Sequence, residues 1–189
     1  AFDNFWANKK APDGVGLQDH FANLWRHVAL RYANNPTVIG YDLMNEPFPG
    51  SSALQSMPAL LEAYGKLVYQ LEGRVMTEEQ LAETWGNKLL SNKENYAQVI
   101  DALYPYSKAF ETEHLQPMYQ KVANSIREVD TDHILFLEHN YYGNMGVKSS
   151  IERTTLPNGQ PDPLVAYAPH GYDLVTDTEN AANASPERV

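Results

Sequence analysis

The sequence predicts an α/β protein built on a parallel sheet and, within that class, a (β/α)8 barrel. Three short apolar stretches, 38–44, 133–137 and 164–168, alternate with helical segments, as in parallel sheets whose faces are covered by helices. Each stretch ends in polar, chemically capable residues, as barrel strands do at the rim that carries the active site. No glycine-rich phosphate loop follows any of them, which disfavours a doubly wound nucleotide-binding sheet.

Composition limits the classes of function. The 189 residues include 24 acidic and 14 basic side chains, a formal net charge of −10, whereas a nucleic-acid surface needs clustered positive charge. We therefore expect no nucleic-acid partner. The absence of cysteine excludes disulfides and thiolate chemistry.

Helical periodicity predicts the elements between the strands. A helix over 17–32 carries apolar residues at helical spacing, and an Asn-Asn-Pro sequence at 34–36 ends it. Residues 51–110 are predicted to form a helical insertion of two or three helices, one of them opened by a capping box at 77–80. Another helix, over 115–126, precedes the second strand.

The first strand ends in Asn45, Glu46 and Pro47, which places a carboxylic acid at the rim of the predicted sheet. Glycoside hydrolysis uses such an acid to protonate the leaving oxygen, while a second carboxylate attacks the sugar or activates water. Asn45 would bind the sugar 2-hydroxyl, and Pro47 would fix the backbone that leaves the strand. The tripeptide alone leaves open a second interpretation, in which Glu46 caps or salt-bridges an ordinary strand–loop junction.

Two motifs resemble glycoside hydrolase family 5. Residues 41–47 (YDLMNEP) resemble the strand that carries the acid/base in that family, and residues 167–173 (YAPHGYD) resemble its later His-x-Tyr strand end. The resemblance covers 1–50 and 133–178. It implies a retaining β-glycosidase on a (β/α)8 barrel that uses neither a cofactor nor a metal.

Other, less specific motifs are similar to one group within that family, the endoglycoceramidases. They are residues 2–6 (FDNFW), 14–20 (GVGLQDH) and 25–28 (WRHV), together with the YAPHGYD run. Endoglycoceramidases release glycans from the ceramide of glycosphingolipids. The similarity therefore implies hydrolysis of the glycan–ceramide linkage.

Position by position, the resemblance implies site roles for four residues. Glu46 corresponds to the general acid/base and Asn45 to the residue that binds the 2-hydroxyl. His170 and Tyr172 correspond to residues that line the cleavage site, where Tyr172 would donate to the nucleophile and keep it ionised. A structural histidine at 170 and a packing tyrosine at 172 stay open as alternatives. Phe48, adjacent to the acid, is predicted to contact sugar or lipid.

The resemblance also implies a nucleophilic glutamate at the end of the strand after the His-x-Tyr strand. Instead, the sequence after Tyr172 is polar, and residues 177–180 have the composition of a loop or a helix start. We therefore expect residues 1–189 to be an internal fragment of one catalytic (β/α)8 barrel domain, about strands 4 to 6 of a longer barrel, with a helical insertion at 51–110. The nucleophile would lie outside the chain, and the fragment alone would be inactive.

Glu138 ends the second strand and is predicted to bind substrate or to support the site from behind. A structural hydrogen bond is the plainest alternative. A nucleophilic role is disfavoured, because retaining carboxyls lie about 5–5.5 Å apart across the sugar, whereas Glu46 and Glu138 end adjacent strands.

Other functions remain open. A metal-dependent barrel hydrolase would use His114, Glu138, His139 and His170, but adjacent residues of a strand point to opposite faces, which weakens joint ligation. A non-catalytic glycan- or glycolipid-binding barrel and another family 5 β-glucosidase or endoglucanase are the remaining alternatives. The expected partner is a glycolipid or β-glycoside, with contact to a membrane surface or micelle through parts outside the chain. This substrate class implies a secreted or lumenal location.

Overall fold

The computed structural model describes residues 1–85, 89–172 and 182. The loop or helix start predicted at 177–180 lies outside the described residues. Three strands, β1 (Gly40–Asp42), β2 (Ile134–Leu137) and β3 (Val165–Tyr167), form a parallel sheet in the order β1-β2-β3. The predicted parallel arrangement is confirmed. The strands are shorter than the apolar stretches that predicted them: each begins one or two residues later, and β1 and β3 also end earlier.

The register aligns the carboxyl ends of the strands. Asp42 lies opposite Phe136, and Leu137 lies opposite Tyr167. The segments that follow the strands consequently leave the sheet at the same edge. Backbone bonds extend this alignment beyond the strands, since the Tyr141 amide donates to the Pro47 carbonyl at 2.9 Å.

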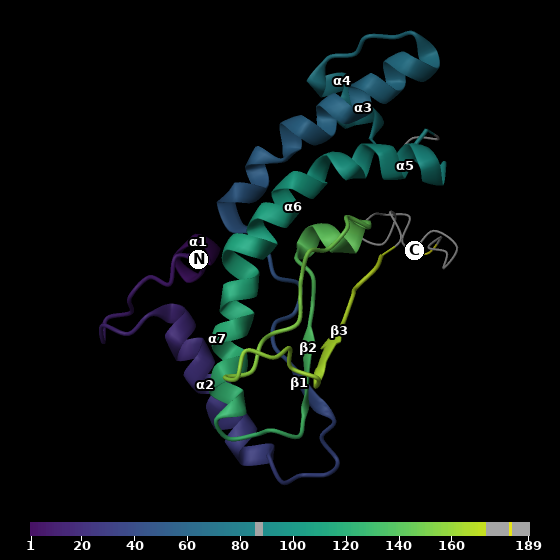
Figure 1. The fold of residues 1–189 in the computed structure, drawn as a ribbon. Coiled ribbons are helices and arrows are strands. Elements are labelled where there is room, and N and C mark those ends of the chain that lie inside the picture. The colour runs from purple at the N-terminus through teal and green to yellow at the C-terminus, as the bar shows by residue number, and fades with distance from the viewer. Residues whose placement is uncertain (86–88, 173–181, 183–189) are drawn as a thin grey trace.

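Helices cover one face of the sheet and make the first core. The helices α2 (Leu17–Tyr32) and α7 (Gln116–Arg127) lie beside each other and beside the strands (Figure 1). The Trp25 indole on α2 donates to the Leu43 carbonyl at 3.1 Å, which ties this helix to the end of β1. The buried residues of this core from the strands and α7 include Tyr41, Leu43, Leu135, Leu137, Met118, Tyr119, Val122 and Ile126.

The predicted insertion is helical and forms a second core. It contains a 3-10 helix (Gly50–Gln55), α3 (Met57–Glu72), α4 (Glu78–Thr84) and α5 (Lys93–Ile100), with the predicted capping box present at the start of α4. Figure 1 shows α3, α4 and α5 at the end of the molecule away from the strands. Their core includes Leu60, Tyr64, Leu67, Val68, Leu81, Val99 and Ile100.

One long helical column joins the two cores. After a 3-10 turn (Asp101–Leu103), α6 (Tyr104–Phe110) continues through a π-helical turn (Glu111–Leu115) into α7, as Figure 1 shows. The predicted boundary at residue 110 therefore falls inside this column. A π turn inserts a residue into the helical ladder and so re-aims the side chains before it. The short helix α1 (Phe2–Trp6) packs against α2 and the 3-10 helix.

A buried ion pair fixes the other end of the strands. The Arg127 side chain is 7% exposed and its Nε donates to Asp162 Oδ2 at 2.7 Å. The remaining guanidinium donors reach the carbonyls of Asp130, His133 and Leu164 at 2.9–3.2 Å. One cation thus holds the segments that enter β2 and β3. Within the described residues, no helix has the length and hydropathy to cross a membrane.

We predict that Arg127→Met lowers the free energy of unfolding by about 3–5 kcal/mol, because it leaves the Asp162 carboxylate buried without its cation. Urea unfolding curves measure the change. Arg26→Met is the matched control, since Arg26 makes an exposed pair with Glu128, the residue directly after α7, and such pairs contribute about 1 kcal/mol or less. Equal losses in the two variants would contradict the structural role given to Arg127.

Candidate active site

Three of the predicted site residues meet at the carboxyl edge of the sheet. The Glu46 carboxyl oxygen Oε1 accepts from the Tyr172 hydroxyl at 2.6 Å and lies 2.9 Å from His170 Nδ1. Glu46 follows β1, whereas His170 and Tyr172 follow β3, so the sheet brings together residues more than 120 positions apart in the sequence. The shared rim predicted for Glu46, Glu138 and His170 is present.

The backbone at Glu46 is unusual. Its φ angle is +46°, in the left-handed region that non-glycine residues rarely occupy. Pro47 restricts this residue further, because a residue that precedes proline favours extended conformations. The sequence suggested that the strand itself presents Glu46. In the structure, a tight turn after the end of β1 at Asp42 presents it. Such backbone outliers cluster at functional sites, where surrounding contacts hold them.

Glu138 lies beneath this group. It is 1% exposed, its Oε2 accepts the Glu46 amide N–H at 2.7 Å, and its Oε1 lies 3.1 Å from His170 Nε2. Direct contact with a sugar, predicted from the sequence, does not fit a carboxyl that is buried and has both oxygens occupied. The position fits the other predicted role, support from behind.

The pKa values of the Glu46 and Glu138 carboxyls shift in opposite directions. The Tyr172 hydroxyl and then the His170 ring stabilise the ionised form of Glu46 and lower its pKa. Burial, and next the neighbouring Asp42 carboxylate, raise the pKa of Glu138 despite the bond from the Glu46 amide. The hydrogen bond to Glu46, with the nearby carboxylates, raises the pKa of His170. The group therefore favours a proton on the histidine ring and charge on Glu46.

His139 orders the chain segment that carries His170. Its Nε2 lies 3.0 Å from the His170 amide N, and its Nδ1 lies 2.8 Å from the Asn140 carbonyl. Nε2 accepts from the His170 N–H, so that the proton on Nδ1 is donated to the Asn140 carbonyl. The absence of a side chain at Gly143 makes room for the ring, since a Cβ there would lie 2.2 Å from His139 Nδ1. From the sequence, His139 is a candidate only for the disfavoured metal site.

Asn45 and Phe48 occupy the rim around the acid. Asn45 is exposed, so its amide is available to a ligand. The Phe48 ring contacts Phe2 and Tyr141 edge to face, with centroids 5.3 and 5.6 Å away. Phe48 is half-buried in this aromatic cluster, and its predicted contact with sugar or lipid stays a prediction. Among the described residues, no group of three or more His, Asp or Glu side chains is arranged to hold a metal ion.

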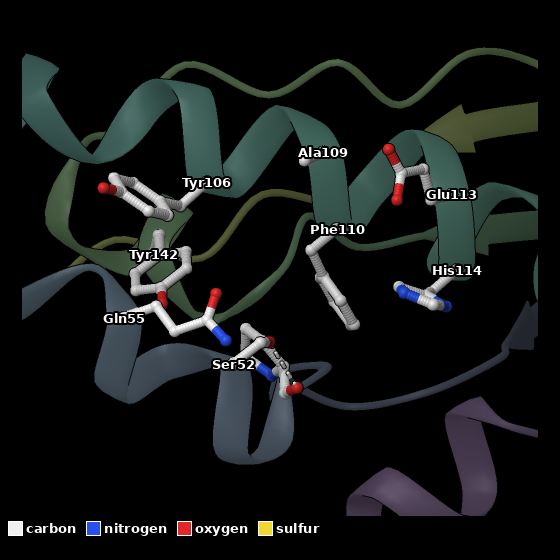
Figure 2. A pocket seen from close by; sticks show the side chains of 9 residues that line it. Ser52, Gln55, Tyr106, Ala109, Phe110, Glu113, His114 and Tyr142 are labelled. Carbon is white, nitrogen blue, oxygen red and sulfur yellow. Dashed lines mark hydrogen bonds between the residues drawn. The ribbon is translucent and has the colours of Figure 1, made fainter.

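A separate pocket of about 180 Å³ lies between the 3-10 helix Gly50–Gln55 and the column of α6 and the π turn (Figure 2). Figure 2 shows the rings of Phe110 and Tyr106 on one wall, with Ser52 and Gln55 opposite them. None of the residues predicted for the glycosidase site lines this pocket, although His114 of the alternative metal site does. We place the chemistry at the Glu46 rim, and not at this pocket, because Tyr172 and His170 hold the Glu46 carboxyl there in a defined geometry.

Comparisons with known proteins found a matching family and several similar proteins. The family described as Cellulase (glycosyl hydrolase family 5) matches residues 3–188. An endoglycoceramidase from Hydra vulgaris is 28% identical over 138 residues, which cover 73% of this chain and 17% of that protein. An endoglycoceramidase from Cyanea nozakii is 42% identical over 50 residues, which cover 26% of this chain and 9% of that protein.

Solved structures of endo-glycoceramidase II from Rhodococcus sp. are also similar. The complex with ganglioside GM3 matches at a TM-score of 0.55 and 30% identity, covering 93% of this chain and 27% of that one. The lactosyl-enzyme intermediate matches at a TM-score of 0.54 and 30% identity, covering 92% and 27%. The chain thus spans less than a third of the relatives it matches.

We predict that Tyr172→Phe raises the pKa of Glu46. The hydroxyl donates to the carboxylate and so favours its ionised form, and removing the donor favours the protonated form. An NMR titration of labelled glutamate carboxyls, with Glu46 assigned by its loss in Glu46→Gln, measures the direction. Tyr167→Phe is the control, because the Tyr167 hydroxyl interacts with Ser149 and not with Glu46. An unchanged or lower pKa in Tyr172→Phe would contradict the geometry.

Proposed function

This chain belongs to glycosyl hydrolase family 5, and on that premise we propose that it is part of a retaining β-glycosidase in which Glu46 is the general acid/base. The observation that carries the proposal is the Glu46 carboxyl, held by His170 and Tyr172 at the open rim of a parallel sheet. Asn45, exposed next to the acid, binds the sugar 2-hydroxyl. Phe48 borders the substrate on the side of the leaving group.

The mechanism has two steps. Glu46 protonates the leaving oxygen while a second carboxylate attacks the anomeric carbon from the opposite face of the sugar, and the glycan becomes bonded to the enzyme. Glu46 then removes a proton from water, which attacks the same carbon and releases the glycan. A covalent intermediate of this kind is named for the Rhodococcus relative. Glu138 does not supply the nucleophile, because it is buried and bonded to the Glu46 backbone.

The second carboxylate also explains how Glu46 can be protonated as a general acid although its neighbours lower its pKa. A general acid must be protonated before the first step, whereas Tyr172 and His170 lower the pKa of Glu46. A carboxylate about 5–5.5 Å away raises that pKa by like-charge repulsion. Tyr172 then donates to the nucleophile, which keeps the nucleophile ionised and releases Glu46 from its stabilising bond.

The architecture proposed for the whole protein is a closed (β/α)8 barrel. Residues 1–189 supply an internal part of it, about strands 4 to 6, with the helical insertion at 51–110, and the nucleophile comes from outside this range. Two observations support this arrangement. The sheet formed by the described residues has three strands and is not closed, and the chain spans a small share of each relative. Residues 1–189 alone then lack turnover.

The substrate proposed is a glycosphingolipid, cleaved between glycan and ceramide. Endoglycoceramidases among the relatives support this choice, and one of them is described in complex with ganglioside GM3. The partner is then a lipid in a membrane surface or micelle, and the enzyme works in a secreted or lumenal location. The family's description as Cellulase favours the alternative, a β-glucosidase or endoglucanase that acts on sugar aglycones.

In the full-length protein, we predict that Glu46→Gln lowers turnover of lactosylceramide about 1,000-fold, since general acid–base catalysis contributes roughly 10²–10⁴-fold. The first step on an aryl lactoside with an activated leaving group falls far less, because that leaving group needs little protonation. Glu113→Gln, a surface variant at the separate pocket, is the control and keeps wild-type turnover.

Equal first-step losses on the two substrates would show that Glu46 is not the general acid. Release of intact lactose and free ceramide by the wild-type protein supports the proposed substrate. Hydrolysis of cello-oligosaccharides without any cleavage of lactosylceramide would replace it with the sugar-aglycone alternative. Binding of glycolipid without turnover of any glycoside would indicate a non-catalytic barrel.

A further inference from the structure

Glu138 is a buried acid in contact with the site, and both of its carboxyl oxygens have partners there. A buried carboxyl is costly unless it is paired and hydrogen-bonded. Its two oxygens bind two different elements of the site, the Glu46 backbone through Oε2 and the His170 ring through Oε1. Tyr119, fully buried on α7, donates its hydroxyl to the Glu138 carbonyl at 3.0 Å and fixes the backbone at this position.

The bond to the Glu46 backbone stabilises an unfavourable conformation. The left-handed φ of Glu46 and the proline after it both work against the turn that presents the acid. A backbone N–H that donates to a carboxylate at 2.7 Å makes a charge-assisted bond, stronger than one between neutral groups. This bond forms only when the turn aims the N–H at Glu138, so it selects the conformation that presents the acid.

The bond to the ring sets the orientation of His170. The two ring nitrogens contact two carboxyls, Nδ1 with Glu46 and Nε2 with Glu138. A neutral imidazole carries a single N–H, so bonds to both carboxyls call for a doubly protonated ring or a protonated carboxyl. The pKa directions agree, because neighbouring carboxylates raise the pKa of His170 and burial raises that of Glu138. Asp42 is the other acid that acts on this ring, and His139 and Tyr172 contact its faces.

We propose that Glu138 is a positioning residue of the acid site, which holds the Glu46 turn with one oxygen and the His170 ring with the other. The three residues form a closed ring: Glu46 N–H to Glu138, Glu138 to His170, and His170 to the Glu46 carboxyl. Glu138 therefore aligns the acid without touching substrate. This inference rests on the proposed role of Glu46.

The test uses Glu138→Gln in the full-length protein, with Asp130→Asn as the matched control. Asp130 is also a buried carboxylate bonded to a histidine ring, that of His133, but it lies before β2 at the other end of the strand. Both variants lose a buried carboxylate, but only Glu138→Gln breaks the ring. We expect kcat to fall about 100-fold in Glu138→Gln with KM little changed, since small misplacements of catalytic groups have effects of this size. The NMR titration of His170, assigned by its loss in His170→Asn, should move to lower pH in Glu138→Gln and stay unchanged in Asp130→Asn.

Wild-type kcat in Glu138→Gln, an unmoved His170 titration in that variant, or an equal shift of that titration in Asp130→Asn would each overturn the inference. Should Glu138→Gln fail to fold, Glu138→Asp carries the test. It keeps the charge on a shorter side chain, so kcat should fall while His170 keeps its titration, and wild-type kcat would overturn the inference. A full-length protein inactive on every glycoside would refute the proposed function alone, because the His170 titration then still decides whether Glu138 holds the ring.

Discussion

The parallel register of β1, β2 and β3 is the constraint on which the site depends. It sends the segments after all three strands to one edge, so that an acid from the first, a carboxyl from the second and a histidine from the third meet within hydrogen-bond distance. Each strand contributes a different property. β1 leads to the exposed acid, β2 to the buried support, and β3 to the ring that touches both. Antiparallel pairing of any strand would send its residue to the far edge.

The helical column behind the sheet keeps this edge in place. Its π turn directs the buried Glu111 carboxyl toward the loop after β2, where it accepts from the backbone N–H and the side-chain amide of Asn140 at 3.1 and 2.8 Å. The Asn140 carbonyl in turn accepts a hydrogen bond from His139 Nδ1, and His139 Nε2 accepts one from the His170 backbone N–H. A chain of buried polar contacts thus runs from the helix to the site. Such networks are rigid when every member is satisfied.

The sequence predicted the elements and side chains whose signals are local. The apolar stretches located the strands, and the polar residues after them identified Glu46 and His170 as neighbours at one rim. The turn at Glu46 and the π turn at Glu111 escaped prediction, because each depends on partners far along the chain. The sequence left Glu138 between contact with substrate and support from behind for the same reason: its position after a strand is visible in the sequence, whereas its burial and its two partners arise only from packing. Tyr172 donates to Glu46 in this structure, and the nucleophile expected as its partner is proposed to lie outside residues 1–189.

We infer that Glu46 protonates the leaving group, while a carboxylate outside residues 1–189 attacks the sugar and Glu138 supports the acid from beneath. Trapping the covalent intermediate separates these roles. A 2-deoxy-2-fluoro-β-lactoside with an activated leaving group forms a glycosyl-enzyme that breaks down slowly, and proteolysis with mass spectrometry locates the labelled residue. We expect a single labelled glutamate outside residues 1–189. A label on Glu138 or Glu46 would show that these roles are wrong.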